Sequence, residues 1–168
     1  LKKLNACLTD AKAILGGSGA KGTWISGNHD ADIFVLFDYK KYAPKTNELS
    51  EILLPCLKKA FPNIKPTRLH GSRDYFQLDY QNCTFEIIPI LKISQSNQAL
   101  NITDISPLHA IWINKKTKDL KDEILLAKQF CRAQRMYGAE SHIQGFSGYV
   151  LEILIAHYHS FEKLLQAA

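Results

Sequence analysis

Three acidic residues in two stretches of the chain could bind a metal ion. Asp30 and Asp32 are two residues apart at the start of the apolar run 33–37. In a β-strand the side chains of residues i and i+2 lie on the same face, so the two carboxylates repel each other unless a cation lies between them. Two carboxylates and phosphate oxygens are ligands that suit Mg²⁺. The pair alone does not decide the matter, because an Asp-x-Asp at a turn more often caps backbone groups.

Glu86 strengthens the metal interpretation because it lies in the middle of an apolar run, next to Phe85, Ile87 and Ile88. A carboxylate is costly to bury unless it is paired or bound to a metal. Three carboxylates on neighbouring strands match two-metal phosphoryl transfer, in which the ions stabilise the attacking and leaving oxygens. From these residues alone, an exposed position on an edge strand explains Glu86 equally well.

A segment of small residues precedes the aspartates. Residues 16–22, Gly-Gly-Ser-Gly-Ala-Lys-Gly, combine a flexible backbone with the hydroxyl of Ser18 and the ammonium group of Lys21. Such a backbone lets N–H groups approach phosphate oxygens, and Lys21 can add a positive charge. The segment is not a Walker loop, because no Ser or Thr follows Lys21 directly before a helix. A helix C-cap would explain Gly16 and Gly17, but not the whole segment.

The elements that must position these residues form a mixed α/β half. Apolar spacing predicts a helix over 2–15 that ends at the glycines. Strand-forming residues predict a first hairpin, with strands at 23–25 and 33–37 and a polar turn at 26–28. A second hairpin is predicted from 75–80 and 83–91, because only Gln81 and Asn82 separate them. The remaining element is a helix over 47–61, which Pro55 should kink or split.

The chain after about residue 104 is predicted to be helical. Ser106 and Pro107 form an N-cap with proline at the first helical position, which opens a helix over 108–114. Further helices are expected over about 120–134 and 148–158, and the helical pattern continues from 160 to 168. We therefore expect a catalytic domain over 1–104 and a helical domain over 105–168.

Composition sets broad limits on the class of protein. The chain has 168 residues, 46% of them hydrophobic, and a formal net charge of +5, which suits a polyanionic partner such as nucleic acid without requiring one. The four cysteines are far apart and indicate reduced thiols, and no stretch resembles a signal peptide or a membrane span, so a cytoplasmic location is expected. Three histidines and a basic run are expected to be solvent-exposed rather than ligands: His29, His157 and His159, and Lys115, Lys116, Lys118 and Lys121.

The aspartates and the small-residue segment belong to a longer series of short sequence blocks. The series comprises 17–18, 21–24, Gly27, Asp30 and Asp32, 70–75, 85–89, 103–109, 137–141 and 145–149. Together the blocks resemble the class I (archaeal-type) CCA-adding enzymes of the nucleotidyltransferase (polymerase β-like) superfamily. A Gly-Ser followed by Asp-x-Asp is typical of the whole superfamily, whereas Tyr-Gly-Ala-Glu-Ser at 137–141 and Gly-Phe-Ser-Gly-Tyr at 145–149 indicate this class.

The resemblance implies an α+β nucleotidyltransferase fold, with a mixed sheet and flanking helices, followed by a helical domain. It implies a metal-dependent enzyme that adds CMP, CMP and AMP to the 3′ end of tRNA from CTP and ATP, releases pyrophosphate and uses two Mg²⁺ ions. The implied partners are the tRNA acceptor end, ATP and CTP, without a membrane, and the oligomeric state is not indicated. By resemblance, Asp30, Asp32 and Glu86 are the catalytic metal ligands; Gly17, Ser18, Lys21, His109, Lys128 and Tyr137 bind the nucleotide; and Gly145, Ser147 and Gly148 contact tRNA.

Three departures from the family pattern leave alternatives open. Ala31 replaces an aliphatic residue between the aspartates and should affect packing only, whereas Glu86 stands where the family more often has Asp. The family's body and tail domains are absent, so the chain is expected to be a fragment or an unusually small member. A poly(A) polymerase or oligoadenylate synthetase relative shares the same catalytic signature. An RNA-binding module that has lost catalysis is the third reading.

Overall fold

The computed structural model describes residues 1–27 and 30–168, so the predicted exposure of His29 and the last residue of the predicted turn lie outside the described residues. The chain divides into two compact units. Unit 1 comprises Leu1–Gly19 and His29–His109, and unit 2 comprises Ala20–Asn28 and Ala110–Ala168. Unit 2 thus begins at Ala110 rather than directly after the predicted boundary at 104, and it also includes a short segment from the first part of the chain.

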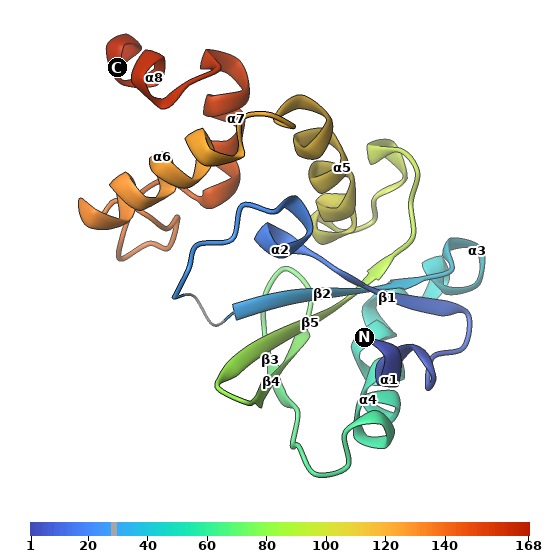
Figure 1. Cartoon of the computed structure of the whole chain (residues 1–168). Coiled ribbons are helices and arrows are strands. Elements are labelled where there is room, and N and C mark those ends of the chain that lie inside the picture. Colours follow the sequence, from blue (N-terminus) through green and yellow to red (C-terminus); the bar gives the residue numbers. More distant parts are fainter. Residues whose placement is uncertain (28–29) are drawn as a thin grey trace. The chain divides into compact units, whose positions relative to one another are not determined.

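Unit 1 is built on a five-stranded mixed sheet in the order β1-β2-β5-β4-β3 (Figure 1). The strands are β1 (Ala11–Leu15), β2 (Asp30–Phe37), β3 (Thr67–Leu69), β4 (Tyr75–Tyr80) and β5 (Cys83–Leu91). The central strands β2 and β5 run parallel, and the other neighbouring pairs are antiparallel. The α+β fold class predicted from the sequence is therefore confirmed.

Short helices and one longer helix accompany the sheet. They are α1 (Lys2–Asn5), α2 (Gly17–Lys21), α3 (Tyr39–Tyr42), the 3₁₀ segment Ala43–Glu48, α4 (Leu49–Ala60), and the 3₁₀ segments Ser96–Gln98 and Ile102–Ile105. Helices α1 and α4 lie on the same side of the sheet (Figure 1). Leu4, Leu49, Leu53 and Leu57 pack there against Ile33, Val35, Phe37, Ile87 and Leu91. The helix predicted over 47–61 is confirmed as α4, which continues through Pro55 without splitting.

Two predictions for the N-terminal region were wrong. The helix predicted over 2–15 is instead the short helix α1 followed by strand β1. Asp10 has a φ of 55°, which no helix accommodates, and the Asn5 side chain binds both backbone groups of Ala13, which closes the turn between α1 and β1. The first predicted hairpin is also wrong, because residues 23–25 form no strand and β1 is the antiparallel neighbour of β2.

The second predicted hairpin is confirmed. Strands β4 and β5 pair directly through the turn at Gln81 and Asn82, whose φ angles are 50° and 61°. Two positive φ values are the requirement of the tight turns that match the twist of paired strands, and Asn tolerates this conformation better than most residues. Figure 1 shows how this hairpin brings β5 alongside β2 in the middle of the sheet.

Unit 2 is mainly helical, as the sequence predicted. Its helices are α5 (Ser106–Lys116), which begins in unit 1, α6 (Lys121–Ala133), α7 (Gly148–Tyr158) and α8 (Phe161–Ala167). Ile124 and Ala127 of α6 pack against Ile155 of α7 and Phe161 of α8. His157 and His159 are exposed, as expected, and no helix within residues 1–27 and 30–168 is long and apolar enough to cross a membrane.

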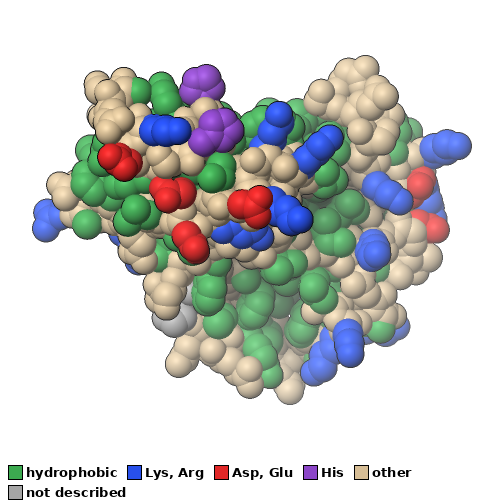
Figure 2. Space-filling model, turned by 45° about the horizontal axis from the view of Figure 1, so that its top comes forward, with side chains coloured by type: hydrophobic (Ala, Val, Ile, Leu, Met, Phe, Trp, Pro, Cys, Tyr) green, Lys and Arg blue, Asp and Glu red, His purple; other side chains and the backbone are tan. Residues whose placement is uncertain are grey.

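The net positive charge is spread over the surface. Figure 2 shows Lys and Arg side chains distributed over the face that it draws, among apolar and acidic side chains. Lys115, Lys116 and Lys118 are exposed, whereas Lys121 is half-buried. Overall charge therefore does not identify a binding site by itself.

Candidate active site

The central strand pair brings acidic residues from two stretches of the chain together. In the parallel register of β2 and β5, Asp32 is the partner of Glu86, and Asp30 is the partner of Thr84. Paired residues of neighbouring strands lie on the same face, about 5 Å apart, and Asp30 shares that face because it precedes Asp32 by two residues. The register therefore places Asp30, Asp32 and Glu86 at one end of one face of the sheet.

Glu86 is half-buried on a central strand, since β5 has β2 on one side and β4 on the other. This position excludes the alternative in which Glu86 is an exposed edge-strand residue. Burial raises the pKa of the Glu86 carboxyl, and the negative charges of Asp32 and Asp30 raise it further. The three groups thus lie close enough to repel one another, and a cation among them would relieve that repulsion.

The small-residue segment packs directly against Asp32. The backbone N–H of Gly16 donates to the backbone carbonyl of Asp32 over 2.8 Å. Gly17 has a φ of 51°, and a Cβ added to it would overlap Oδ2 of Asp32. Only glycine satisfies both the backbone conformation and the close approach of the carboxylate. Ser18 follows in the short helix α2, half-buried, so the Gly-Ser pair and the acidic site are adjacent in unit 1.

The carboxylates of the acidic site match part of the ligand set that Mg²⁺ usually has in proteins. Within residues 1–27 and 30–168, no three His, Cys, Asp or Glu side chains gather closely enough to hold an ion by themselves. Mg²⁺ is usually bound by one or two carboxylates, with water and substrate phosphates as its remaining ligands. The register pair Asp32 and Glu86, with Asp30 next to it, meets that requirement, while a three-carboxylate ligand set stays a prediction.

A second charged cluster lies in unit 2 and is centred on Glu152 of α7. Oε2 of Glu152 is 2.5 Å from Nζ of Lys21, and Oε1 is 2.7 Å from Nζ of Lys128 on α6. Oε1 also accepts a hydrogen bond of 2.7 Å from the Thr23 hydroxyl. Two of the residues predicted to bind nucleotide, 107 positions apart in the sequence (128 − 21), therefore contact the same carboxylate.

This cluster is buried and has a net charge of +1. The side chains of Lys128 and Glu152 are 1% and 0% exposed, and that of Lys21 is 10% exposed. Burial alone would raise the pKa of Glu152, but the two ammonium groups outweigh burial and hold this pKa below its ordinary value. Burial lowers the pKa of Lys128, and Glu152 opposes that shift.

Tyr137 and Gly148 lie beside the cluster. A Cβ added to Gly148 would be 2.8 Å from the Tyr137 hydroxyl and 3.4 Å from Nζ of Lys128. The structure thus brings three of the predicted nucleotide-binding residues, Lys21, Lys128 and Tyr137, to one place in unit 2. His109 is half-buried in α5 and belongs to unit 1.

The residues predicted to contact tRNA each have a structural role within unit 2. Ser147 is the N-cap of α7, and its hydroxyl accepts from the backbone N–H of Val150. A Cβ at Gly145 would overlap the carbonyl of Met136, and Gly148 allows the approach of Tyr137. Contact with tRNA stays a prediction for all three.

Family models match both parts of the chain. Residues 1–82 match the model described as "Nucleotidyltransferase domain", and residues 122–168 match "tRNA nucleotidyltransferase, second domain". The two matches occur in the order expected for one protein family and include Asp30, Asp32, Lys128 and Glu152. The chain therefore contains a nucleotidyltransferase domain followed by a region like the second domain of tRNA nucleotidyltransferases.

The chain is similar to archaeal proteins named "CCA-adding enzyme". The chain is 43% identical to that of Nanoarchaeum equitans over 90% of its own length and 37% of the relative's. It is 34% identical to that of Methanosarcina mazei over 96% of its own length and 35% of the relative's. The chain therefore spans about a third of the length of these relatives.

Solved structures confirm the nucleotidyltransferase fold. A cytoplasmic RNA terminal U-transferase matches 94% of the chain and 45% of its own, with a TM-score of 0.63 and 17% identity. The Escherichia coli MS115-1 protein CdnC, solved with ATP, matches 99% of the chain and 60% of its own, with a TM-score of 0.67 and 22% identity. At these identities the likeness concerns the fold alone.

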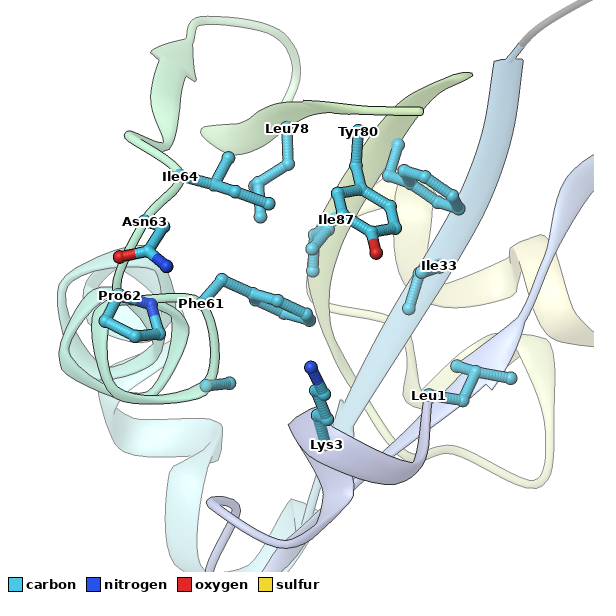
Figure 3. Close-up of a pocket in the computed structure, with 12 residues that line it drawn as sticks. Leu1, Lys3, Ile33, Phe61, Pro62, Asn63, Ile64, Leu78, Tyr80 and Ile87 are labelled. Carbon is cyan, nitrogen blue, oxygen red and sulfur yellow. The ribbon is translucent and has the colours of Figure 1, made fainter. Parts of the chain in front are cut away.

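A pocket of unit 1 lies away from the acidic site. It has a volume of about 470 Å³, and Phe61, Ile64 and Tyr80 are among the residues around it (Figure 3). Ile33 and Ile87, which also line it, alternate along their strands with Asp32 and Glu86 and so lie on the opposite face of the sheet. Its lining is mainly apolar, and we assign it no role in nucleotidyl transfer.

Sequence reasoning missed two residues of the charged cluster in unit 2, Thr23 and Glu152. Glu152 lies within the apolar run Val150–Ile155, and this signal is the same one that identified Glu86. Thr23 carried no comparable signal, because its partners Lys128 and Glu152 are more than 100 positions away.

Proposed function

We propose that this chain is the catalytic portion of a CCA-adding enzyme, which transfers CMP, CMP and AMP from CTP and ATP to the 3′ end of tRNA and releases pyrophosphate. The observation that carries the proposal is the register pair of Asp32 and Glu86 beside Gly17. It occurs in a chain that matches a nucleotidyltransferase domain over 1–82 and the second domain of tRNA nucleotidyltransferases over 122–168. A pair of carboxylates next to a glycine turn supports metal-dependent phosphoryl transfer, and the family match supports tRNA as the acceptor.

The acidic residues have distinct roles in this proposal. Asp30, Asp32 and Glu86 hold two Mg²⁺ ions, as the resemblance to the family implies. Divalent cations bound here neutralise the triphosphate and stabilise the charge that develops on the attacking and leaving oxygens. Glu86, whose pKa is raised by burial and by the two aspartates, is suited to accept the proton of the 3′ hydroxyl as its oxygen bonds to the α-phosphorus.

The remaining predicted residues bind the nucleotide and the tRNA. Gly17 and Ser18 offer backbone and hydroxyl contacts to phosphate, as the resemblance implies. Lys21, Lys128 and Tyr137 gather in unit 2, and their cluster has the positive charge that a triphosphate requires. His109 joins this nucleotide-binding set by resemblance. The resemblance assigns contact with the tRNA acceptor end to Gly145, Ser147 and Gly148, which lie before and at the start of α7.

The test is incorporation of labelled CTP and ATP into tRNA that lacks its terminal CCA, together with Mg²⁺-dependent binding of CTP to the same chain. We expect Asp32→Ala to abolish incorporation and the Mg²⁺ dependence of CTP binding, while the fold is retained. Asp119→Ala, at an exposed position between α5 and α6, is the matched control and should behave like the wild type.

Three results would contradict the proposal. Unchanged activity of Asp32→Ala would refute the metal assignment. Long adenylate tails instead of a CCA end would favour the poly(A) polymerase alternative. Mg²⁺-dependent CTP binding without incorporation by a full-length parent chain would support an RNA-binding module that has lost catalysis.

A further inference from the structure

Glu152 is the central group of the buried cluster in unit 2, although no sequence motif assigned it a role. Its two carboxylate oxygens are shared by the ammonium groups of Lys21 and Lys128 and by the Thr23 hydroxyl. Two ammonium groups near one point repel each other, and burial removes the water that would otherwise screen them. A carboxylate between them is the feature that allows both to remain charged there.

The ammonium groups of the two lysines differ in the hydrogen bonds that they donate. The three protons of the Lys128 ammonium group have three acceptors, namely the backbone carbonyl of Thr23 at 3.2 Å, its hydroxyl at 3.0 Å and Oε1 of Glu152 at 2.7 Å. Among residues 1–27 and 30–168, the ammonium group of Lys21 donates one hydrogen bond, to Oε2 of Glu152, and lies 5.5 Å from the centre of the Tyr149 ring. Lys21 is also the more exposed of the two, so it has donors available for an anion from solvent.

From this geometry we propose that Glu152 is a positioning residue of the triphosphate site: it orients Lys21 toward the phosphates and keeps the buried Lys128 cationic behind it. The proposal rests on the proposed nucleotide-binding function and adds to it the residue that maintains the charge of the site. Glu152 itself does not contact the substrate in this arrangement. It acts through the two lysines, and the net charge of +1 remains available for an anion.

Removal of Glu152 should change the pKa values of charged and titratable groups at and near Lys128. They are Lys21 on α2, Tyr137 and Glu140 on the turn between α6 and α7, Tyr149 and Glu152 on α7, and Cys131 and Arg132 on α6 itself. Burial and the charge of Glu152 raise the pKa values of Tyr137 and Tyr149, and burial raises that of Cys131. Loss of the Glu152 charge should therefore lower the pKa of Lys128 further, because Glu152 opposes the lowering that burial causes.

The experiment measures the affinity of the full chain for inorganic tripolyphosphate from pH 6 to pH 8.5. Glu152→Gln keeps the size of the side chain and removes its charge. We expect the affinity of this variant to be closest to that of the wild type at pH 6, where the ammonium form of Lys128 is most favoured. The ratio of its affinity to that of the wild type should fall as the pH rises, by up to about tenfold for each pH unit above the lowered pKa of Lys128.

Controls separate this effect from loss of structure. Glu162→Gln changes an exposed carboxylate on α8 and should follow the wild type at every pH. The double variant Lys128→Met with Glu152→Gln removes the buried pair together, which usually preserves folding better than removing one partner. It should bind more weakly than the wild type by the same factor at every pH, because the titrating lysine is gone.

The possible outcomes distinguish this inference from the proposed function. If Glu152→Gln binds tripolyphosphate as the wild type does throughout, or more weakly by one constant factor, Glu152 has no positioning role. If Glu152→Gln does not fold, a double variant with wild-type affinity overturns the inference in the same way. If the wild-type chain binds neither tripolyphosphate nor CTP at any pH, the nucleotide site itself is refuted.

Discussion

Replacing Glu86 by Gln should make the metal-free protein more stable while abolishing its activity. In the absence of a cation, Glu86 is held on a central strand next to Asp32, with Asp30 nearby, and these charges repel. At a strand spacing of about 5 Å, two unit charges interact by about 3 kcal/mol at an effective dielectric constant of about 20. Because Glu86 is only half-buried, solvent screening reduces this to about 1 kcal/mol.

The assay is thermal unfolding of the wild type and Glu86→Gln at pH 7.5, with EDTA and then with increasing Mg²⁺. A gain of about 1 kcal/mol corresponds to an increase in Tm of about 2–4 °C for a chain of this size. With Mg²⁺ at about ten times its dissociation constant, the wild type should gain about 1.4 kcal/mol, and the variant much less. Glu48→Gln, an exposed carboxylate next to α4, is the control for general charge effects.

The pH dependence has a definite sign. Because the folded-state pKa of Glu86 is raised, the folded state binds the proton more tightly than the unfolded state. The wild type is therefore most stable relative to the Gln variant at low pH. This advantage is lost as the pH rises from the unfolded-state pKa of Glu86 through its raised folded-state pKa. A variant that is less stable than the wild type at pH 7.5 in EDTA, or equally stabilised by Mg²⁺, would refute the reasoning.

Three further substitutions test the packing around the two sites. Gly17→Ala should reduce nucleotide incorporation by at least about tenfold, because its Cβ overlaps the carboxylate of Asp32 at a positive φ, whereas Gly71→Ala, with its nearest contact at 3.4 Å, should be close to wild type in the same assay. Asp104→Ala should destabilise the fold by roughly 3–5 kcal/mol in urea unfolding, because it leaves a buried arginine and three backbone N–H groups without their acceptor. Ser147→Ala removes the N-cap of α7 and should cost about 1 kcal/mol, measured as a lower Tm.

The sequence predicted the elements whose signals are local. The hairpin of β4 and β5 depends on two adjacent residues, Gln81 and Asn82, and the helices of unit 2 on apolar periodicity, so both were found. The N-cap predicted at Ser106 was wrong, because Ser106 is itself the first helical residue of α5. The prediction of a helix over 2–15 was wrong because apolar spacing does not reveal the positive φ at Asp10 or the pairing of β1 with β2. Pairing with a strand more than 15 positions away is decided by tertiary packing, which local periodicity does not contain.

Residues 23–25 illustrate the same limit in a different way. Thr23 and Ile25 are buried, as strand-forming residues usually are, but they are buried in unit 2 rather than in the sheet. The Thr23 hydroxyl and carbonyl accept from Lys128, which lies 105 positions later. The strand predicted from β-propensity is absent, because this propensity does not indicate which unit buries Thr23 and Ile25.

Glu86 and Glu152 share the sequence signal that is most informative about function in this chain. Each is a carboxylate inside an apolar run, and in each case the structure supplies the reason: two aspartates that call for a cation beside Glu86, and two lysines beside Glu152. The environments shift the two pKa values in opposite directions, upward for Glu86 and downward for Glu152. One carboxylate is therefore suited to bind a metal and accept a proton, and the other to remain ionised as a fixed counter-charge. The signal locates a buried charge that must be compensated, but only the partners brought in by the fold decide what that charge does.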